Sequence, residues 1–199
     1  MIPDKLGIIM LASGLSTRFG TEDKLLAPLN GKPLASHTAS LFASCRTDLH
    51  CAVLPETALE RANLFSTQRW TILYNPSPEL GQGASIAIAA RHLLSTDATA
   101  ALVLLADMPF VSQSYLSDLI KATASGYAAM SQSGGVLQPP ALFPRAAFSA
   151  LANCSGDTGA RGVFTKLSKT ALHPISPDMA RDIDTLDSLN GAQESSHYA

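Results

Sequence analysis

Cysteine and charge are both scarce in this sequence, and each scarcity excludes a class of protein. The 199 residues contain only Cys45, Cys51 and Cys154. This odd, unpatterned set fits neither a zinc site nor a disulfide framework, so we expect reduced thiols. Only 15% of the residues are charged and the net charge is -2. A broad basic surface for nucleic acid is therefore excluded, and any affinity for phosphate must come from a local site.

Long apolar runs and common hydrolase motifs are missing too. No apolar run approaches the roughly 18 residues of a membrane span, and residues 1–5 lack the apolar core of a signal peptide. We therefore expect no membrane partner and a cytoplasmic location. The five histidines are scattered and no Gly-x-Ser-x-Gly elbow occurs, so the sequence does not indicate a nucleophile and base pair.

Strand and helix patterns, by contrast, alternate regularly over the first two thirds of the chain. Short uncharged runs rich in branched residues are typical of strands buried on both faces of a parallel sheet. Strands are expected at 8–12, 50–54, 70–74 and 100–107, and helices at 33–42, 56–65, 86–94 and 112–124. This alternation predicts an α/β fold built from βαβ units, and the length suits a single domain.

The last third is less regular. We expect strands at 127–131 and 171–175, helices at 145–151 and up to Leu167, a last helix at 186–191, and a frayed tail at 193–199. The segment 136–143 is extended, but it contains Pro139-Pro140. Because proline has no backbone N–H to donate, we expect this segment to stay out of the interior of a sheet.

The loop after the first expected strand has the composition of a phosphate-binding loop. Gly14 and Gly20 allow the backbone to turn so that successive N–H groups can converge on an anion. Arg18 and Lys24 add two cations. The alternative is an exposed loop in which both charges simply face water.

Asp107 is the second informative residue, because it follows an entirely apolar strand and precedes Pro109. Ligands of open α/β sheets bind at the carboxyl ends of strands, where a carboxylate can hold a magnesium ion shared with phosphate oxygens. The alternative is that Asp107 caps the next helix, but Ser112 is better placed to do so.

Three other segments carry candidate residues. Ser85 lies near a helix N-terminus, where it either helps to bind an anion or is only a capping or first-turn residue. The preceding Gly81-Gln82-Gly83 lacks the third glycine of a dinucleotide fingerprint. Asp157 is either a helix cap or, with Arg161, part of a ligand-binding loop. Asp182 and Asp184 alternate in an extended segment, so both can face one site.

Together these motifs resemble a nucleotidyltransferase family that includes molybdenum cofactor cytidylyltransferase and guanylyltransferase. The match consists of five stretches in order: Leu11-Ala-Ser-Gly-Leu-Ser-Thr-Arg-Phe-Gly20 with Lys24, Asn75-Pro76 with Gly83-Ala-Ser-Ile86, Leu105-Ala-Asp-Met-Pro109, Gly156-Asp-Thr-Gly-Ala-Arg161, and Asp182-Ile-Asp-Thr185. The resemblance implies one Rossmann-like three-layer domain of the GT-A type over residues 1–199. Its mostly parallel sheet would have seven strands, one of them reversed.

The resemblance also implies roles for single residues. Arg18, Lys24 and Asp107 would be catalytic. Asp107, Asp184 and Asp182 would bind Mg²⁺ or Mn²⁺, and Asp157 and Arg161 would contact the acceptor. The nucleotide would contact Leu11, Ala12, Ser13, Gly14, Asn75, Gly83 and Ser85.

The activity implied is transfer of CMP from CTP to the terminal phosphate of molybdopterin, with a molybdoenzyme or its maturation factor as a further partner. CTP is favoured over GTP because 156–161 and 182–185 are closer to the cytidylyl branch. Two departures leave alternatives open: Ser13 stands where relatives have Ala or Gly, and Gln138-Pro-Pro140 where relatives often have Gly-His-Pro. The alternatives are transfer from GTP, another phosphorylated acceptor such as a sugar or alcohol phosphate, and a non-catalytic protein that binds molybdenum cofactor.

Overall fold

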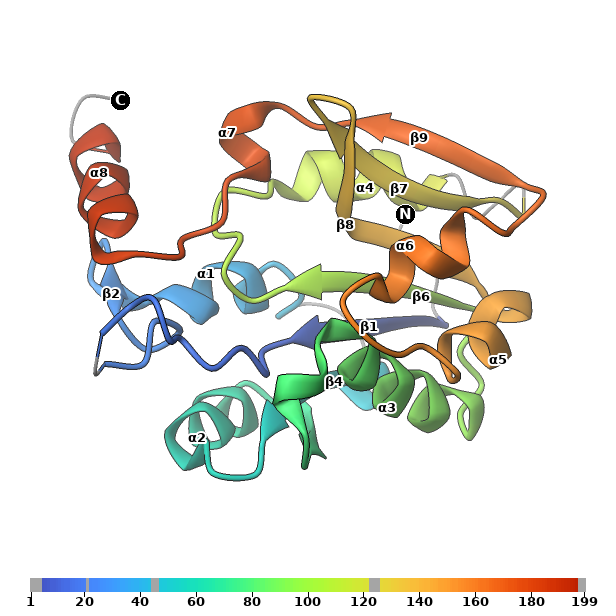
Figure 1. Cartoon of the computed structure of the whole chain (residues 1–199), viewed down its shortest axis with the longest axis horizontal. Coiled ribbons are helices and arrows are strands. Elements are labelled where there is room, and N and C mark those ends of the chain that lie inside the picture. Colours follow the sequence, from blue (N-terminus) through green and yellow to red (C-terminus); the bar gives the residue numbers. More distant parts are fainter. Residues whose placement is uncertain (1–4, 21, 44–46, 122–125, 197–199) are drawn as a thin grey trace.

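The computed structural model describes residues 5–20, 22–43, 47–121 and 126–196 (Figure 1). Cys45, the end of the helix expected at 112–124 and residues 197–199 of the expected tail therefore lie outside the described residues. The strands are β1 (Leu6–Leu11), β2 (Pro28–Leu29), β3 (Lys32–Pro33), β4 (His50–Pro55), β5 (Thr71–Asn75), β6 (Ala100–Leu105), β7 (Ala128–Ser133), β8 (Val136–Pro144) and β9 (Thr170–Pro174). The α-helices are α1 (Leu34–Ser40), α2 (Leu59–Thr67), α3 (Gln82–Leu94), α4 (Gln113–Lys121), α5 (Phe148–Leu151), α6 (Gly159–Phe164), α7 (Pro177–Ala180) and α8 (Leu186–Ser196), with short 3₁₀ turns η1 (Thr47–Leu49), η2 (Pro78–Leu80) and η4 (Arg145–Ala147).

The main sheet has seven strands in the order β5-β4-β1-β6-β8-β7-β9. β8 runs antiparallel to both of its neighbours, and the remaining pairs are parallel. The expected mostly parallel, seven-stranded sheet with one reversed strand is thus confirmed. The sheet order places β4 on one side of β1 and β6 on the other.

Helices cover both faces of the sheet and form a three-layer structure (Figure 1). Alternate residues of β1 enter the two cores: Ile8 and Met10 on one face, Ile9 and Leu11 on the other. The first core is completed by apolar residues of α1, α2 and α4, and the second by those of α3, α5 and α6. None of the helices in the described part of the chain is long and apolar enough to cross a membrane.

The expectation that Pro139-Pro140 keeps its segment out of the sheet is wrong, because β8 lies between β6 and β7. Two features accommodate the prolines. The pairing with β6 covers only residues 141–144, and the β7 register jumps from Met130 opposite Ala141 to Ser131 opposite Gln138. The prolines sit in this irregularity, where no ladder bond needs their missing N–H. The Ser131 hydroxyl donates to the Pro140 carbonyl at 2.6 Å.

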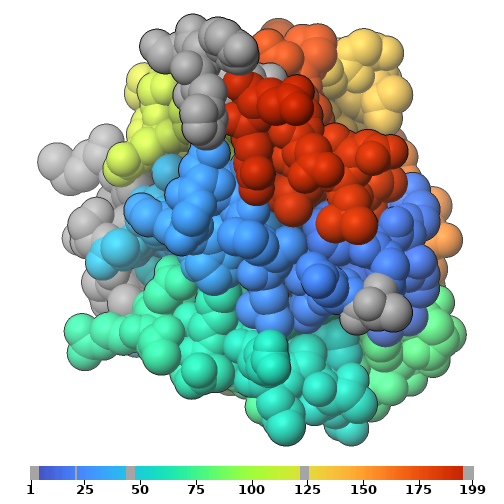
Figure 2. Space-filling model, turned by 90° about the vertical axis from the view of Figure 1, so that its left-hand side faces the viewer, coloured from blue at the N-terminus to red at the C-terminus, as the bar shows by residue number. Residues whose placement is uncertain are grey.

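Two helices are longer than expected. α3 begins at Gln82 because Gly81, with φ 85°, provides the turn that precedes it. α8 continues past Gly191 to Ser196, so part of the expected frayed tail is helical. The Gln193 side chain donates to the Pro28 carbonyl at 2.6 Å. Figure 2 shows α8 packed beside the segment that contains the antiparallel pair β2 and β3.

Candidate functional site

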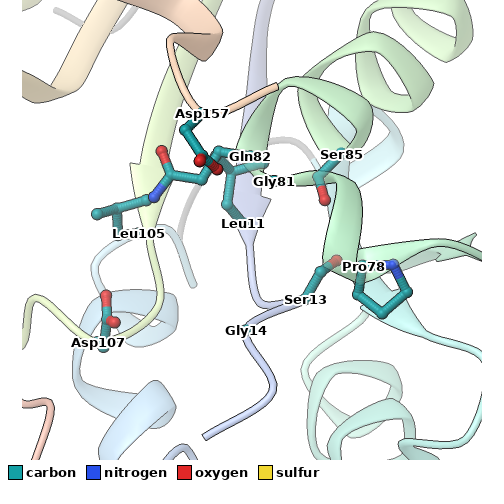
Figure 3. Close-up of a pocket in the computed structure, with 10 residues that line it drawn as sticks. All are labelled: Leu11, Ser13, Gly14, Pro78, Gly81, Gln82, Ser85, Leu105, Asp107 and Asp157. Carbon is teal, nitrogen blue, oxygen red and sulfur yellow. The ribbon is translucent and has the colours of Figure 1, made fainter. Parts of the chain in front are cut away.

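A cavity of about 220 Å³ opens at the carboxyl ends of β1 and β6. The chain leaves β1 for β4 on one side of the sheet, whereas β6 lies on the other, so the cavity occupies the switch point at which open α/β sheets bind ligands. Figure 3 shows Asp107 at one end of the cavity and Ser13 and Pro78 at the other. The lining residues are Leu11, Ser13, Gly14, Pro78, Gly81, Gln82, Ser85, Leu105, Asp107 and Asp157.

The loop after β1 forms one wall of the cavity. The Ser13 hydroxyl donates to the Val53 carbonyl of β4 at 2.9 Å, and the Ala12 amide donates to the same oxygen at 3.0 Å. The extra hydroxyl that distinguishes Ser13 from alanine or glycine is therefore tied to the neighbouring strand.

Arg61 of α2 holds this loop, a role that the sequence reasoning missed. Its Nη1 donates to the carbonyls of Ala12 at 2.6 Å and Gly14 at 2.8 Å. Its Nε donates to Asp23 at 2.5 Å, and its Nη2 to the Ser16 hydroxyl at 3.2 Å. The residue is only 5% exposed. One signal was available: Arg61 lies four residues before the buried Phe65, on the apolar face of its helix.

An ionic cluster adjoins the Asp107 end of the cavity. The Lys24 ammonium donates to Asp107 at 2.7 Å and to Asp184 at 2.6 Å, and Arg18 pairs with the second oxygen of Asp184 at 2.9 Å. Burial alone would lower the pKa of Lys24, but the two carboxylates outweigh it and raise that pKa. At Asp184, burial alone would raise the pKa of the carboxyl, but Lys24 and Arg18 outweigh it and lower that pKa.

Asp182 lies near this cluster but differs from Asp184 in its electrostatics. Burial, followed by the charges of Asp184 and Asp107, raises the pKa of Asp182. In the described parts of the chain, no group of three or more His, Cys, Asp or Glu side chains is arranged to hold a metal ion. The assignment of Asp182 as a further metal ligand beside Asp107 and Asp184 stays a prediction from the sequence.

Asp107 and Asp184 nevertheless fit a hard divalent cation. Their oxygens already share one positive charge, the Lys24 ammonium, and magnesium needs only one or two carboxylates beside phosphate and water.

The second wall of the cavity is the N-terminal end of α3. The Asn75 side chain donates to the Ser85 hydroxyl at 3.0 Å and accepts from the Ser77 amide at 2.9 Å. The side chains of Asn75 and Ser85 are buried, and these bonds hold the loop between β5 and α3. Ser85 lies in the first turns of α3 and is not its cap.

Gly81 and Gly83 allow α3 to approach the loop around Asp157 closely. The Gly83 amide donates to the Gly156 carbonyl at 2.9 Å. A Cβ on Gly83 would lie 2.5 Å from the Ser155 carbonyl carbon, and one on Gly81 would collide with Asp157. These glycines therefore serve helix–loop packing, and not a dinucleotide fingerprint.

The structure brings together most of the predicted site residues. Within the described chain, the cavity is lined by Leu11, Ser13, Gly14, Ser85, Asp107 and Asp157, whereas Ala12, Asn75 and Gly83 lie behind its wall. Arg18, Lys24 and Asp184 form the ionic cluster, with Asp182 nearby. Arg161 is exposed on α6 and is not part of the lining. Pro78, Gly81, Gln82 and Leu105 also line the cavity; they belong to segments in which the sequence predicts site residues, although none of the four was itself singled out.

Fold and site together define an α/β protein of the nucleotide-binding class, with a glycine-containing loop and paired cations and carboxylates at its switch point. Residues 8–171 match the family model described as the MobA-like NTP transferase domain, and the chain belongs to this family of nucleotidyltransferases.

Known proteins resemble the chain over most of its length. The purine catabolism protein PucB of Bacillus subtilis is 31% identical over an alignment of 163 positions that covers 77% of this chain and 77% of that protein. The structure of Rv0371C from Mycobacterium tuberculosis, in complex with manganese, superposes with a TM-score of 0.75 at 19% identity and covers 96% of this chain and 99% of that one. Molybdopterin-guanine dinucleotide biosynthesis protein A from Archaeoglobus fulgidus gives a TM-score of 0.69 at 19% identity, covering 97% and 100%. At this identity, the two structures show a common fold.

Proposed function

We propose that this chain is a Mg²⁺- or Mn²⁺-dependent nucleotidyltransferase that transfers CMP from CTP to the terminal phosphate of a molybdopterin-type acceptor. The observation that carries the proposal is the buried Lys24 ammonium, which Asp107 and Asp184 hold at the end of the cavity. A site that assembles two carboxylates and two cations beside a cavity suits a metal-bound triphosphate. Manganese in the related Rv0371C structure supports a divalent cation.

The chemistry requires positioning and charge neutralisation. An oxygen of the acceptor phosphate attacks the α-phosphorus of the nucleotide, and the bond from that phosphorus to the oxygen bridging to the β-phosphate breaks. A diphosphate linkage forms and pyrophosphate leaves. The attacking oxygen of a phosphate monoester is already anionic at pH 7, so no catalytic base is needed.

Each charged group has a part in this reaction. Arg18 and Lys24 neutralise the phosphates and the leaving pyrophosphate. Asp107 and Asp184 would hold a divalent cation, which would supply further charge neutralisation at the transferred phosphate. Asp182, which lies near this cluster, would be a further ligand of the cation.

Nucleotide and acceptor specificity belong to the same proposal. The 156–161 and 182–185 motifs favour CTP over GTP. Gln82 places an amide in the cavity, where its donor and acceptor groups could bind a nucleotide base (Figure 3). Asp157 in the lining and Arg161 on α6 form the acceptor side. A molybdoenzyme or its maturation factor would receive the product, and the cytoplasmic location stays a prediction from sequence.

Pyrophosphate release tests the proposal. The purified protein is incubated with Mg²⁺ or Mn²⁺ and each of CTP, GTP, UTP and ATP, with and without molybdopterin. We expect release only with CTP and the pterin together. Release only with GTP would assign the protein to the guanylyl branch, and release only with a sugar or alcohol phosphate would replace the acceptor. Binding of a pterin without any release would indicate the non-catalytic alternative.

A further inference from the structure

We infer that Arg61 is a positioning residue that orients the peptide groups of the phosphate loop, defined as residues 12–20, toward the nucleotide. The inference rests on the proposed function and extends it to a residue outside the cavity lining. The guanidinium enters from α2, is 5% exposed and donates to four groups of this loop and its downstream end.

The first step concerns the direction of two peptide planes. In a trans peptide the carbonyl of one residue and the N–H of the next point in opposite directions. Arg61 binds the carbonyls of Ala12 and Gly14, so the amides of Ser13 and Leu15 point away from α2. Within the described residues, neither amide donates a hydrogen bond to the protein. Both amides therefore face the side of the loop opposite Arg61 and are left able to donate to an anion bound there.

The second step concerns the middle of the loop and the chain just after it. The same guanidinium bonds Asp23, which precedes Lys24, and the hydroxyl of Ser16, which adopts a φ of 54°. Asp23 also accepts from the Leu25 amide at 3.0 Å. One buried group therefore holds the start and the middle of the loop and, through Asp23, the chain just beyond its end. The amides of the loop and the Lys24 ammonium consequently keep a set distance from each other.

Only arginine has the donors for this task. Its planar fork carries five N–H groups in fixed directions, whereas a lysine ammonium at the same place has three donors on one atom and cannot reach two carbonyls and a carboxylate in these directions. Lysine would keep the charge and lose the geometry. The conservative substitution therefore separates a positional role from a purely electrostatic one.

Arg145 provides a matched control. Like Arg61, it donates to backbone carbonyls. Its three partners are the carbonyls of Leu94, Thr96 and Ala98, at 3.1, 3.0 and 2.7 Å. These carbonyls precede β6, so they lie at the opposite end of that strand from Asp107. Loss of Arg145 removes the same kind of interaction without touching the phosphate loop.

The experiment measures nucleotide binding by calorimetry, and KM and kcat by pyrophosphate release, in the full chain with Mg²⁺. We compare wild type with Arg61→Lys, Arg61→Met, Asp23→Asn and Arg145→Met. Both Arg61 variants should raise the Kd and KM for CTP about tenfold or more, while the KM for the acceptor stays within about twofold, because a misplaced anchoring group affects the step that it positions. Asp23→Asn should raise the KM for CTP less, and Arg145→Met should lower the melting temperature only.

The outcomes separate the inference from the proposed function. Wild-type protein that binds none of the four nucleotides contradicts the proposed function. If wild type binds a nucleotide and folded Arg61→Lys binds it with equal affinity, the positioning role alone is overturned. If neither Arg61 variant folds, a Kd for CTP in Asp23→Asn equal to that of wild type overturns the claim that the Arg61–Asp23 pair sets the position of Lys24.

Discussion

At the scale of single residues, the site depends on a balance between two carboxylates and two cations. Asp107 is at the centre of this balance, since it contacts both Lys24 and the cavity. Its carboxylate is placed at the end of β6 and not in either hydrophobic core. Its removal should therefore affect charge and metal placement far more than packing.

Asp107→Ala should lower turnover about a thousandfold or more, because a metal ion and its ligand contribute several kcal/mol to the stabilisation of a developing charge. The measurement is pyrophosphate release, with circular dichroism to verify the fold. Asp118→Ala is the control, since Asp118 is an exposed residue that pairs only with Lys121 in the described chain. Unchanged turnover in folded Asp107→Ala would remove the metal site from the mechanism.

Lys24→Met should have opposite effects on metal binding and on activity. The ammonium lies within 2.7 Å of both proposed ligands, so it competes with a divalent cation for the same oxygens. Without nucleotide, we expect Lys24→Met to bind Mn²⁺ about tenfold more tightly than wild type, as the carboxylates lose their internal counter-ion. Turnover should fall, because the phosphates lose a cation. Electron paramagnetic resonance counts free Mn²⁺, and equal affinities in the two proteins would show that the ammonium does not compete.

Sequence reasoning succeeded at this scale where a residue and its neighbours along the chain carry the signal. Arg18 and Lys24 follow a glycine loop, and Asp107 ends an apolar strand. Arg61 was missed because its partners lie 38 to 49 residues away. The pairing of Lys24 with Asp184 spans 160 residues, and the sequence could suggest only that both belong to one site.

At the scale of elements, the close contact between the start of α3 and the loop 155–157 joins the nucleotide side of the cavity to Asp157. Gly83 is the point at which the loop backbone comes closest, with backbone atoms of Ser155 and Gly156 2.5 to 2.7 Å from the position of an added Cβ. Backbone atoms cannot move aside as a flexible side chain would. A side chain here must separate the helix from the loop.

Gly83→Ala should destabilise the protein by about 1 to 3 kcal/mol through overpacking and should raise the KM for the acceptor. Gly191→Ala is the control, and it should change the free energy of unfolding in the opposite direction. A Cβ there meets nothing within 4 Å, and alanine in the interior of α8 should stabilise by about 0.5 to 1 kcal/mol. Urea unfolding measures both changes. A stabilised Gly83→Ala protein would show that the helix and the loop are not in close contact.

The elements that were predicted correctly are those whose identity is local. β1, β4 and β6 are buried on nearly every residue, and their uncharged runs are visible in the sequence. β8 was judged wrongly because the rule against proline in sheets applies to paired positions. Whether Pro139 and Pro140 are paired depends on where β6 ends and on a register shift in β7, neither of which is encoded near the prolines.

At the scale of the whole molecule, stability at low pH depends on groups that must change charge on unfolding. His50 begins β4 and is buried against Phe42 and Trp70, with ring centroids 6.0 and 5.1 Å away. Burial among these rings disfavours the imidazolium and lowers the pKa of His50 to about 4, although Asp48 acts in the opposite direction. The folded protein therefore keeps His50 neutral over a range in which the unfolded chain protonates it.

The sign of the effect follows from proton uptake. Between pH 6.5 and 4 the unfolded state binds a proton at residue 50 that the folded state does not, so acidification should cost about 3 kcal/mol of stability from this residue. Asp184, with its lowered pKa, adds a loss only at more acidic pH, and Lys24, with its raised pKa, loses its contribution only above pH 10.5. Asp182, with its raised pKa, acts in the opposite sense, because the folded state takes up its proton first.

His50→Leu isolates the histidine from these other groups, since they are present in both proteins. Urea unfolding at pH 7 and pH 4 should show the variant losing about 3 kcal/mol less stability than wild type over this interval. The absolute stability of the variant at pH 7 does not enter the comparison, so any loss of packing on replacing the imidazole cancels. Equal losses in the two proteins would mean that position 50 admits water or a counter-charge in the folded state, and the aromatic group at the start of β4 would then not be a dry part of the core.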